Sequence, residues 1–283
     1  METLVNMKIG IICDLGYKKS ICMANYYHAL CNIFDDVKTI KNVEDLKDIE
    51  VLFIGNDHYE PHKTIWKNDN FINICNSNQI KVCVYTAENI LHSIYPHNIK
   101  IQRDLERFDN LYQRVIDPDD AIILNKKIAR CSCSKHYKDA ISIPPQKMNK
   151  CVFIGYMYDH RRNLINKLKH NIDIDVIEPI ESWQEYMSTL AKYRFVLSPN
   201  SYVANCFHLK FYEALLVNSI PIHQVHDNTL EYYPIEAKYE DALYFKTGDE
   251  IPDLIKNCSV ETSYNKPWLE DELIDFFEEH DII

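Results

Sequence analysis

Two basic side chains stand where each could meet a negatively charged ligand. Lys210 lies in the first turn of a helix predicted over Phe207–Val217, for which Asn205 is the predicted N-cap. Arg161 begins another predicted helix, Arg161–His170. Helix starts expose N–H groups that bind phosphate together with nearby cations. A lone arginine is most often a solvated surface charge, but the pairing with Lys210 favours phosphate binding.

Short polar segments beside these helices extend the same candidate site. Ser198 and Asn200 follow one predicted strand, and Gly155 and Tyr156 follow another. Because ligands of parallel sheets bind beyond the carboxyl ends of the strands, these positions face a ligand. We expect Ser198 and Asn200 to contact the phosphate groups, and Gly155 and Tyr156 to contact the nucleoside.

Three carboxylates in the first half of the chain are candidates for a general base. Glu88, Asp57 and Asp14 each follow a predicted strand. A carboxylate there could take the proton of an attacking hydroxyl, with Glu88 favoured over Asp57. Each could instead cap a following helix, which is the commoner use. His58 and Tyr59 could line a cleft that binds a glycan, although core packing is the commoner use of such residues.

Apolar runs separated by helical spacing predict two parallel sheets covered on both faces. The predicted elements of the first half are strands Lys8–Cys13, Val51–Ile54 and Ile80–Tyr85 and a helix at Ser20–Phe34. Those of the second half are strands Cys151–Ile154, Ile174–Ile177, Arg194–Leu197 and Ile220–His223, and helices Arg161–His170, Ser182–Tyr193 and Phe207–Val217. We therefore expect two doubly wound domains and a ligand site in the cleft between them.

Domain boundaries are predicted at the proline-rich segment Ile141–Lys150, which reads as a linker. The expected domains are residues 1–145 and residues 150–265. Residues 266–283 form a C-terminal helix with an apolar stripe. This helix either closes the structure by packing on the domains or crosses back to the first one.

Composition sets the class of protein. The 283 residues are 46% apolar, which is enough for two cores, and the net charge of −11 argues against nucleic acid as the main partner. The sequence shows no signal peptide and no apolar run long enough to span a membrane, so we expect a cytoplasmic protein. Ten scattered cysteines indicate a reducing compartment, and Cys131 and Cys133 lack the second pair of a zinc site.

The stretch from Ser198 to Ile222 resembles the donor-binding core of GT-B glycosyltransferases. Their "EAL…G-x-x-P-[VI]" pattern is matched by Glu213-Ala214-Leu215 followed by Ser219-Ile220-Pro221-Ile222. The resemblance implies two Rossmann-like domains facing a cleft, with the acceptor side on residues 1–145 and nucleotide-sugar binding on residues 150–265. It also implies that Glu213 accepts a hydrogen bond from a ribose hydroxyl, the alternative being an exposed helix carboxylate.

A second resemblance concerns Val84–Asn89, which is similar to the "F-Y-T-G-E-N" segment of α1,3-fucosyltransferases and matches their candidate base with Glu88. That family's glutamate before the lysine is replaced here by Leu209. The C-terminal part also resembles exostosin-like transferases, which use UDP-sugars, and virus-encoded glycosyltransferases. These similarities favour a UDP-sugar such as UDP-xylose and leave GDP-fucose open.

The resemblance also bears on the reaction. Retaining GT-B enzymes often carry an acid eight positions before the EAL glutamate, where this chain has Asn205, so inversion is favoured. The Asp-x-Asp pairs at Asp117–Asp119 and Asp173–Asp175 read as surface features, so we expect no catalytic metal and no cofactor. We expect transfer of a sugar from a nucleotide-diphosphate donor to a glycan hydroxyl. The alternative is a non-catalytic protein of the same fold that binds nucleotide-sugar or glycan.

Overall fold

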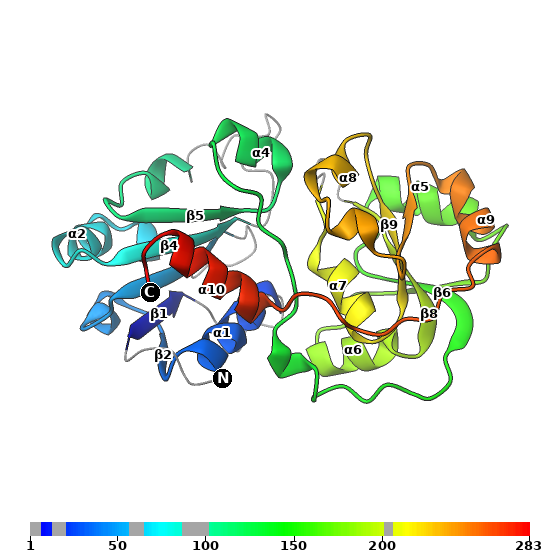
Figure 1. Cartoon of the computed structure of the whole chain (residues 1–283), viewed down its shortest axis with the longest axis horizontal. Coiled ribbons are helices and arrows are strands. Elements are labelled where there is room, and N and C mark those ends of the chain that lie inside the picture. The colour runs from blue at the N-terminus through cyan, green and yellow to red at the C-terminus, as the bar shows by residue number, and fades with distance from the viewer. Residues whose placement is uncertain (1–6, 13–20, 57–64, 87–101, 201–205) are drawn as a thin grey trace. The chain divides into compact units, whose positions relative to one another are not determined.

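The computed structural model describes residues 7–12, 21–56, 65–86, 102–200 and 206–283 (Figure 1). The chain divides into two compact units. The first unit comprises Met1–Arg130, Ser134–His136 and Pro267–Ile283, and the second comprises Cys131–Cys133 and Tyr137–Lys266. Among the described residues, each unit is built on one sheet of five parallel strands.

The sheet of the first unit has the strand order β2-β1-β3-β4-β5. Its strands are β1 (Lys8–Ile12), β2 (Asp36–Thr39), β3 (Val51–Asn56), β4 (Lys81–Thr86) and β5 (Leu111–Val115). Its helices include α1 (Ile21–Ile33), α2 (Asp69–Ser77), α4 (Pro118–Ile123) and α10 (Leu269–Glu279). This doubly wound order reverses direction across the sheet between β1 and β3.

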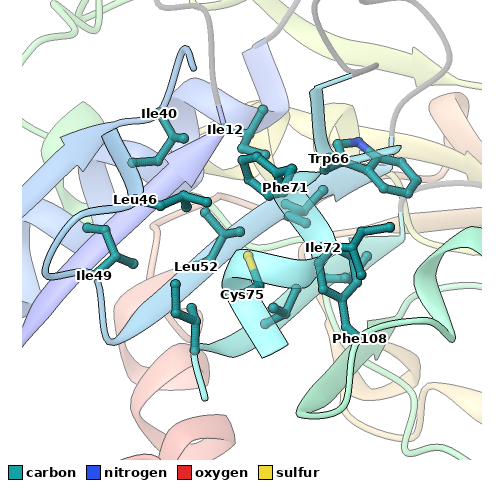
Figure 2. Close-up of a cluster of buried hydrophobic side chains, with 14 of the residues drawn as sticks. Ile12, Ile40, Leu46, Ile49, Leu52, Trp66, Phe71, Ile72, Cys75 and Phe108 are labelled. Carbon is teal, nitrogen blue, oxygen red and sulfur yellow. The ribbon is translucent and has the colours of Figure 1, made fainter. Parts of the chain in front are cut away.

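Helices cover both faces of this sheet. On β3, Leu52 packs in the cluster that holds Phe71 of α2, and Figure 2 shows Phe71 turned toward the sheet. The next residue, Phe53, contacts Tyr26 of α1 and Phe277 of α10, which lies beside α1 in Figure 1. Successive side chains of a strand point to opposite faces, so both faces are buried. This double burial explains the continuous apolar runs.

The sheet of the second unit repeats the same topology with the order β10-β9-β8-β6-β7. Its strands are β6 (Met148–Ile154), β7 (Ile174–Ile177), β8 (Tyr193–Ser198), β9 (Ile220–Gln224) and β10 (Leu243–Phe245). Its helices include α5 (Asp159–Leu168), α6 (Trp183–Leu190), α7 (Leu209–Leu216), α8 (Thr229–Tyr232) and α9 (Ile251–Lys256). The direction of winding reverses between β6 and β8, and crevices at such points are where doubly wound sheets bind ligands.

All seven predicted strands are present, with ends shifted by up to three residues, but β2, β5 and β10 were not predicted. β6 begins at Met148, inside the segment predicted as a linker. The N-cap of α7 is His208, so the prediction of Asn205 as N-cap is wrong; Asn205 itself lies outside the described residues. No helix among the described residues is long and apolar enough to cross a membrane.

Candidate functional site

The candidate site lies in the second unit, at the carboxyl ends of β6 and β8. β6 ends at Ile154 and β8 at Ser198, on either side of the point where the winding of the sheet reverses. The loops that follow these strands lead toward the starts of α5 and α7. The predicted donor-binding residues all come from these loops and helices: Gly155, Tyr156, Arg161, Ser198, Asn200, Lys210 and Glu213.

Lys210 is the cation at the centre of this arrangement. It lies in the first turn of α7, and its ammonium donates a hydrogen bond to Ile154 O at 2.5 Å. Desolvation, and secondarily the charge of Arg161, lowers the pKa of Lys210 to about 8, whereas Glu213 acts to raise it. Among the described residues no carboxylate lies within 4.0 Å of its Nζ. The residue as a whole is partly exposed, whereas its ammonium is held against Ile154 O and the Phe153 ring.

Gly155 makes room for this ammonium. Its φ is +149°, in a region that residues with a side chain rarely adopt. A Cβ atom at this position would lie 3.3 Å from the Nζ of Lys210 and 3.5 Å from the ring of Phe153. The backbone conformation therefore favours glycine here, and any side chain would also require the lysine ammonium to shift by a few tenths of an ångström.

Arg161 supplies a second cation in the first turn of α5. Its Nη1 donates to Tyr156 O at 3.3 Å, and its Cζ lies 5.1 Å from the Tyr158 ring and 5.9 Å from the Phe153 ring. The Tyr156 side chain is 49% exposed and contacts Tyr158 at 6.4 Å between ring centres. The main chain at Tyr156 thus orients the guanidinium, while its ring remains open to solvent.

Glu213 is buried, not the exposed helix carboxylate that was the alternative. It is 4% exposed and accepts a hydrogen bond from Tyr186 Oη at 2.9 Å. Burial raises the pKa of Glu213 to about 7, although hydrogen bonds from Tyr186 and Trp183 and the charge of Lys210 act to lower it. At neutral pH the side chain is therefore divided between its acid and its carboxylate form.

Ser198 and Asn200 are turned toward β9. Ser198 Oγ lies 3.2 Å from Nδ1 of the buried His223, and Asn200 Nδ2 donates to Gln224 O at 2.8 Å. Burial lowers the pKa of His223 to about 3, so the imidazole is neutral. Asn200 Oδ1 is buried and accepts no hydrogen bond from the described residues. Both side chains thus fix the end of β8, and Asn200 retains one free acceptor.

The Asp-x-Asp pairs have other partners. Asp117 is fully buried and caps α4 by accepting from the N–H groups of Asp119 and Asp120, so its prediction as a surface feature in a loop is wrong. Asp173 and Asp175 form ion pairs with Lys150 at 3.1 and 3.3 Å. Within the described residues, no group of three or more His, Cys, Asp or Glu side chains is arranged to hold a metal ion.

The predicted catalytic and acceptor-side residues lie outside the residues that the structure describes. These are Glu88 and Asp57, the weaker candidate Asp14, and the predicted glycan contacts His58 and Tyr59. Their roles stay predictions. Of the predicted site, the structure therefore describes only the residues that were predicted to bind the donor.

Three residues of this site were not found from the sequence. Phe153 was read only as part of an apolar strand, yet its ring lies under Lys210 at 4.8 Å. Tyr186 and Trp183 were read only as members of a helix, yet both reach Glu213. The one available signal was the position of Phe153, an aromatic residue two positions before Gly155, the glycine that follows the strand. The contacts to Glu213 depend on packing between α6 and α7, for which the sequence holds no signal.

The arrangement is suited to bind an anion with two charged groups. Two cations converge at the end of β6, one of them without a carboxylate partner, and α7 adds the partial positive charge of its N-terminus. Glu213 and Asn200 Oδ1 offer hydrogen-bond acceptors, which suit hydroxyl groups. Charged phosphates and a hydroxyl-bearing sugar are complementary to such a set of groups.

Comparison with protein-family models finds no match, and comparison with curated proteins finds none. Among solved structures, the chain is similar to a putative UDP-N-acetylglucosamine 2-epimerase from Listeria monocytogenes, with a TM-score of 0.52 at 11% identity over 90% of this chain and 89% of that one. A DNA-modifying β-glucosyltransferase gives 0.49 at 14% identity over 98% and 94%. An α-glucosyltransferase in complex with UDP and DNA gives 0.43 at 10% identity over 98% and 90%. The first of these similarities and the two parallel sheets establish the fold class: α/β, with two Rossmann-like doubly wound domains of the GT-B kind.

Proposed function

We propose that this chain is a glycosyltransferase that moves a sugar from a nucleotide-diphosphate donor to a hydroxyl of a glycan acceptor. The second unit binds the donor. One observation supports this above the others: Lys210 lies beside Arg161 at the carboxyl end of β6, without a carboxylate at ion-pair distance among the described residues.

The electrostatics of this pair favour an anionic ligand. Burial, and secondarily the nearby positive charge of Arg161, disfavours the charged form of Lys210 and lowers its pKa. A diphosphate would supply the opposing charge and would raise the pKa of the lysine again. The same cations would stabilise the negative charge that develops on a departing nucleoside diphosphate.

The remaining roles follow from the sequence patterns. Glu213 accepts a hydrogen bond from a ribose hydroxyl. Glu88, or else Asp57, takes the proton from the attacking hydroxyl of the acceptor. His58 and Tyr59 contact the glycan. Transfer proceeds with inversion and without a metal, since the two cations supply positive charge at the diphosphate. UDP-xylose or another UDP-sugar is the favoured donor, and GDP-fucose is the second choice.

Ligand binding tests the donor site first. Isothermal titration with UDP and GDP should show binding to the wild type, and Lys210→Met should weaken it at least about tenfold by removing a charge-assisted hydrogen bond. Lys167→Met, at an exposed position on α5, is the matched control and should bind as the wild type does. A wild type that binds neither nucleotide overturns the proposal.

A transfer assay separates the enzyme from a binding protein of the same fold. Product analysis with UDP- and GDP-sugars should show a transferred sugar, and Glu88→Ala or Asp57→Ala should abolish it without loss of UDP binding. Binding without any transfer would favour the non-catalytic alternative, and release of an altered free sugar nucleotide would favour an epimerase. Activity that is lost in EDTA and restored by manganese would rule out the metal-independent mechanism.

A further inference from the structure

The ring of Phe153 is shared by both cations of the proposed donor site. Lys210 Nζ lies 4.8 Å from the ring centre and Arg161 Cζ lies 5.9 Å from it, both within the usual range of a cation–π contact. The ring itself is fully buried, so neither contact is weakened by water on the ring. No other aromatic ring among the described residues has two cations of this unit over it.

We propose that Phe153 is a positioning residue that sets the spacing of Lys210 and Arg161 and thereby favours a diphosphate over a single phosphate. The inference rests on the proposed function, because it concerns how the same site recognises its donor. Phe153, a buried apolar residue of β6, would then help to determine which anion the site prefers.

Packing holds the ring in place beneath the cations. Phe153 belongs to the core cluster formed with Ile165 and Leu168 of α5 and with the neighbouring strands. Gly155 lies beside the ring, since a Cβ there would be at 3.5 Å from it, an ordinary van der Waals distance. The ring is thus fixed by the core, with the ammonium of Lys210 over it.

An aromatic ring differs from a carboxylate as a partner for these cations. Its face attracts positive charge but carries no net charge, so the ring does not neutralise the charge of the lysine or of the arginine. A carboxylate at the same place would neutralise one of them and compete with the ligand. Two cations anchored to one rigid ring present two charged groups at a fixed separation, which matches two phosphate groups better than one.

Replacement of the ring tests this role. Phe153→Leu keeps an apolar side chain but removes the π face, and inorganic pyrophosphate and orthophosphate serve as probes in isothermal titration. The wild type should prefer pyrophosphate, and Phe153→Leu should weaken pyrophosphate binding about tenfold while changing orthophosphate binding less. Phe245→Leu is the matched control: Phe245 is buried in the same core cluster, and no described cation lies over its ring.

The pH dependence separates positioning from a loss of core packing. The ring stabilises the charged lysine, so its removal should move the alkaline limit of pyrophosphate binding to lower pH in Phe153→Leu but not in Phe245→Leu. If the two leucine variants bind alike and share one pH profile, Phe153 has only a packing role and the inference is overturned while the donor site stands. If the wild type binds neither pyrophosphate nor UDP, the donor site and the inference fail together.

Discussion

Because burial raises its pKa to about 7, Glu213 is present in both its protonated and its ionised form at neutral pH. Its oxygen atoms lie between α6 and α7, where Tyr186 and Trp183 bind them and water does not. A protonated Glu213 can donate a hydrogen bond, whereas an ionised one can only accept. The side chain can thus adapt to the ribose hydroxyl that we propose as its partner.

The same burial makes folding stability depend on pH. The pKa of Glu213 is about 7 in the folded chain and near 4.5 in the unfolded chain, so the folded chain binds more protons between these values. Stability from this group is therefore greatest at acid pH and falls as pH rises toward 7. Glu213→Gln should lack this decline, and its stability relative to the wild type should rise by about 3 kcal/mol between pH 4.5 and 7.5.

Urea unfolding followed by circular dichroism across this range provides the measurement. Glu185→Gln, an exposed position on α6, should change stability in parallel with the wild type and serves as the control. A Glu213→Gln curve that also runs parallel to the wild type would show that this carboxyl group titrates normally.

Gly155 carries a prediction of its own. In Gly155→Ala the new Cβ would be strained at φ +149° and would crowd the ammonium of Lys210. We expect a loss of about 1–3 kcal/mol of stability from the backbone strain, together with weaker UDP binding. Urea unfolding and titration on the same samples measure both, and a variant that folds and binds UDP like the wild type would contradict the proposed space requirement.

At the scale of elements, α7 is held at its C-terminal end by a lysine from another segment. Lys147 Nζ donates to Ala191 O at 2.5 Å, to Val217 O at 2.8 Å and to Ser219 Oγ at 3.1 Å. The two carbonyl groups belong to the C-caps of α6 and α7. A cation at these ends opposes the partial negative charge of both helices. Lys147 therefore fixes the pair of helices between which Glu213 is buried.

Lys147→Met should destabilise the second unit by about 2–4 kcal/mol, because it leaves two carbonyl groups near the helix ends without their charged partner. Lys192→Met, an exposed lysine just beyond α6, should change stability by less than about 0.5 kcal/mol. Urea unfolding of the two variants gives the comparison. Equal effects in both would mean that the contacts of Lys147 contribute nothing to stability.

Six of the seven strands that the sequence predicted are central strands of their sheets; the seventh is the edge strand β7. β3 and β4 are continuous apolar runs because helices cover both sides of the sheet. The three missed strands, β2, β5 and β10, lie at sheet edges, where partial exposure permits charged residues or a short length. The edge strand β7 could still be predicted, because its sequence Ile174–Ile177 carries three apolar residues in four.

The positions of the residues in the proposed donor site were predictable to the extent that they follow backbone topology. Lys210 and Arg161 could be placed because residues after parallel strands gather at one edge of the sheet. The orientation of Ser198 and Asn200 toward β9, and the burial of Asp117, could not be placed in this way. These depend on which neighbouring atom satisfies each polar group, which is settled by three-dimensional packing and not by spacing along the chain.

At the scale of the whole molecule, the last helix contributes to the stability of the first unit. Arg114 of β5 donates to Glu272 of α10 at 3.0 Å and to Tyr26 Oη at 3.2 Å, and the Arg114 and Glu272 side chains are almost fully buried. Breaking a buried ion pair leaves a charge without its partner, which is far more costly than losing an exposed pair. The ends of the sequence thus meet in one core.

The two units should respond separately to substitution and ligand. Glu272→Gln should destabilise the first unit by about 3 kcal/mol. Glu279 lies on the same helix, α10, and forms an exposed ion pair with Lys127, so Glu279→Gln should change stability by close to zero. UDP should protect amides of the second unit. Hydrogen exchange resolved by peptide gives both readings, and UDP protection confined to the first unit would contradict the assignment of the donor site.

Glu270 ties together the two segments by which the chain leaves and re-enters the first unit. Its carboxylate accepts hydrogen bonds from Asn32 Nδ2, Ser134 Oγ and Lys135 N, at distances from 2.6 to 3.0 Å. Residues 134–135 and 270 therefore lie side by side, although more than 130 positions separate them in the sequence. In terms of chain order, most of the second unit, Tyr137–Lys266, is an insertion between two segments of the first. An engineered chain with a short loop from His136 to Pro267 would therefore omit this insertion and retain every segment of the first unit.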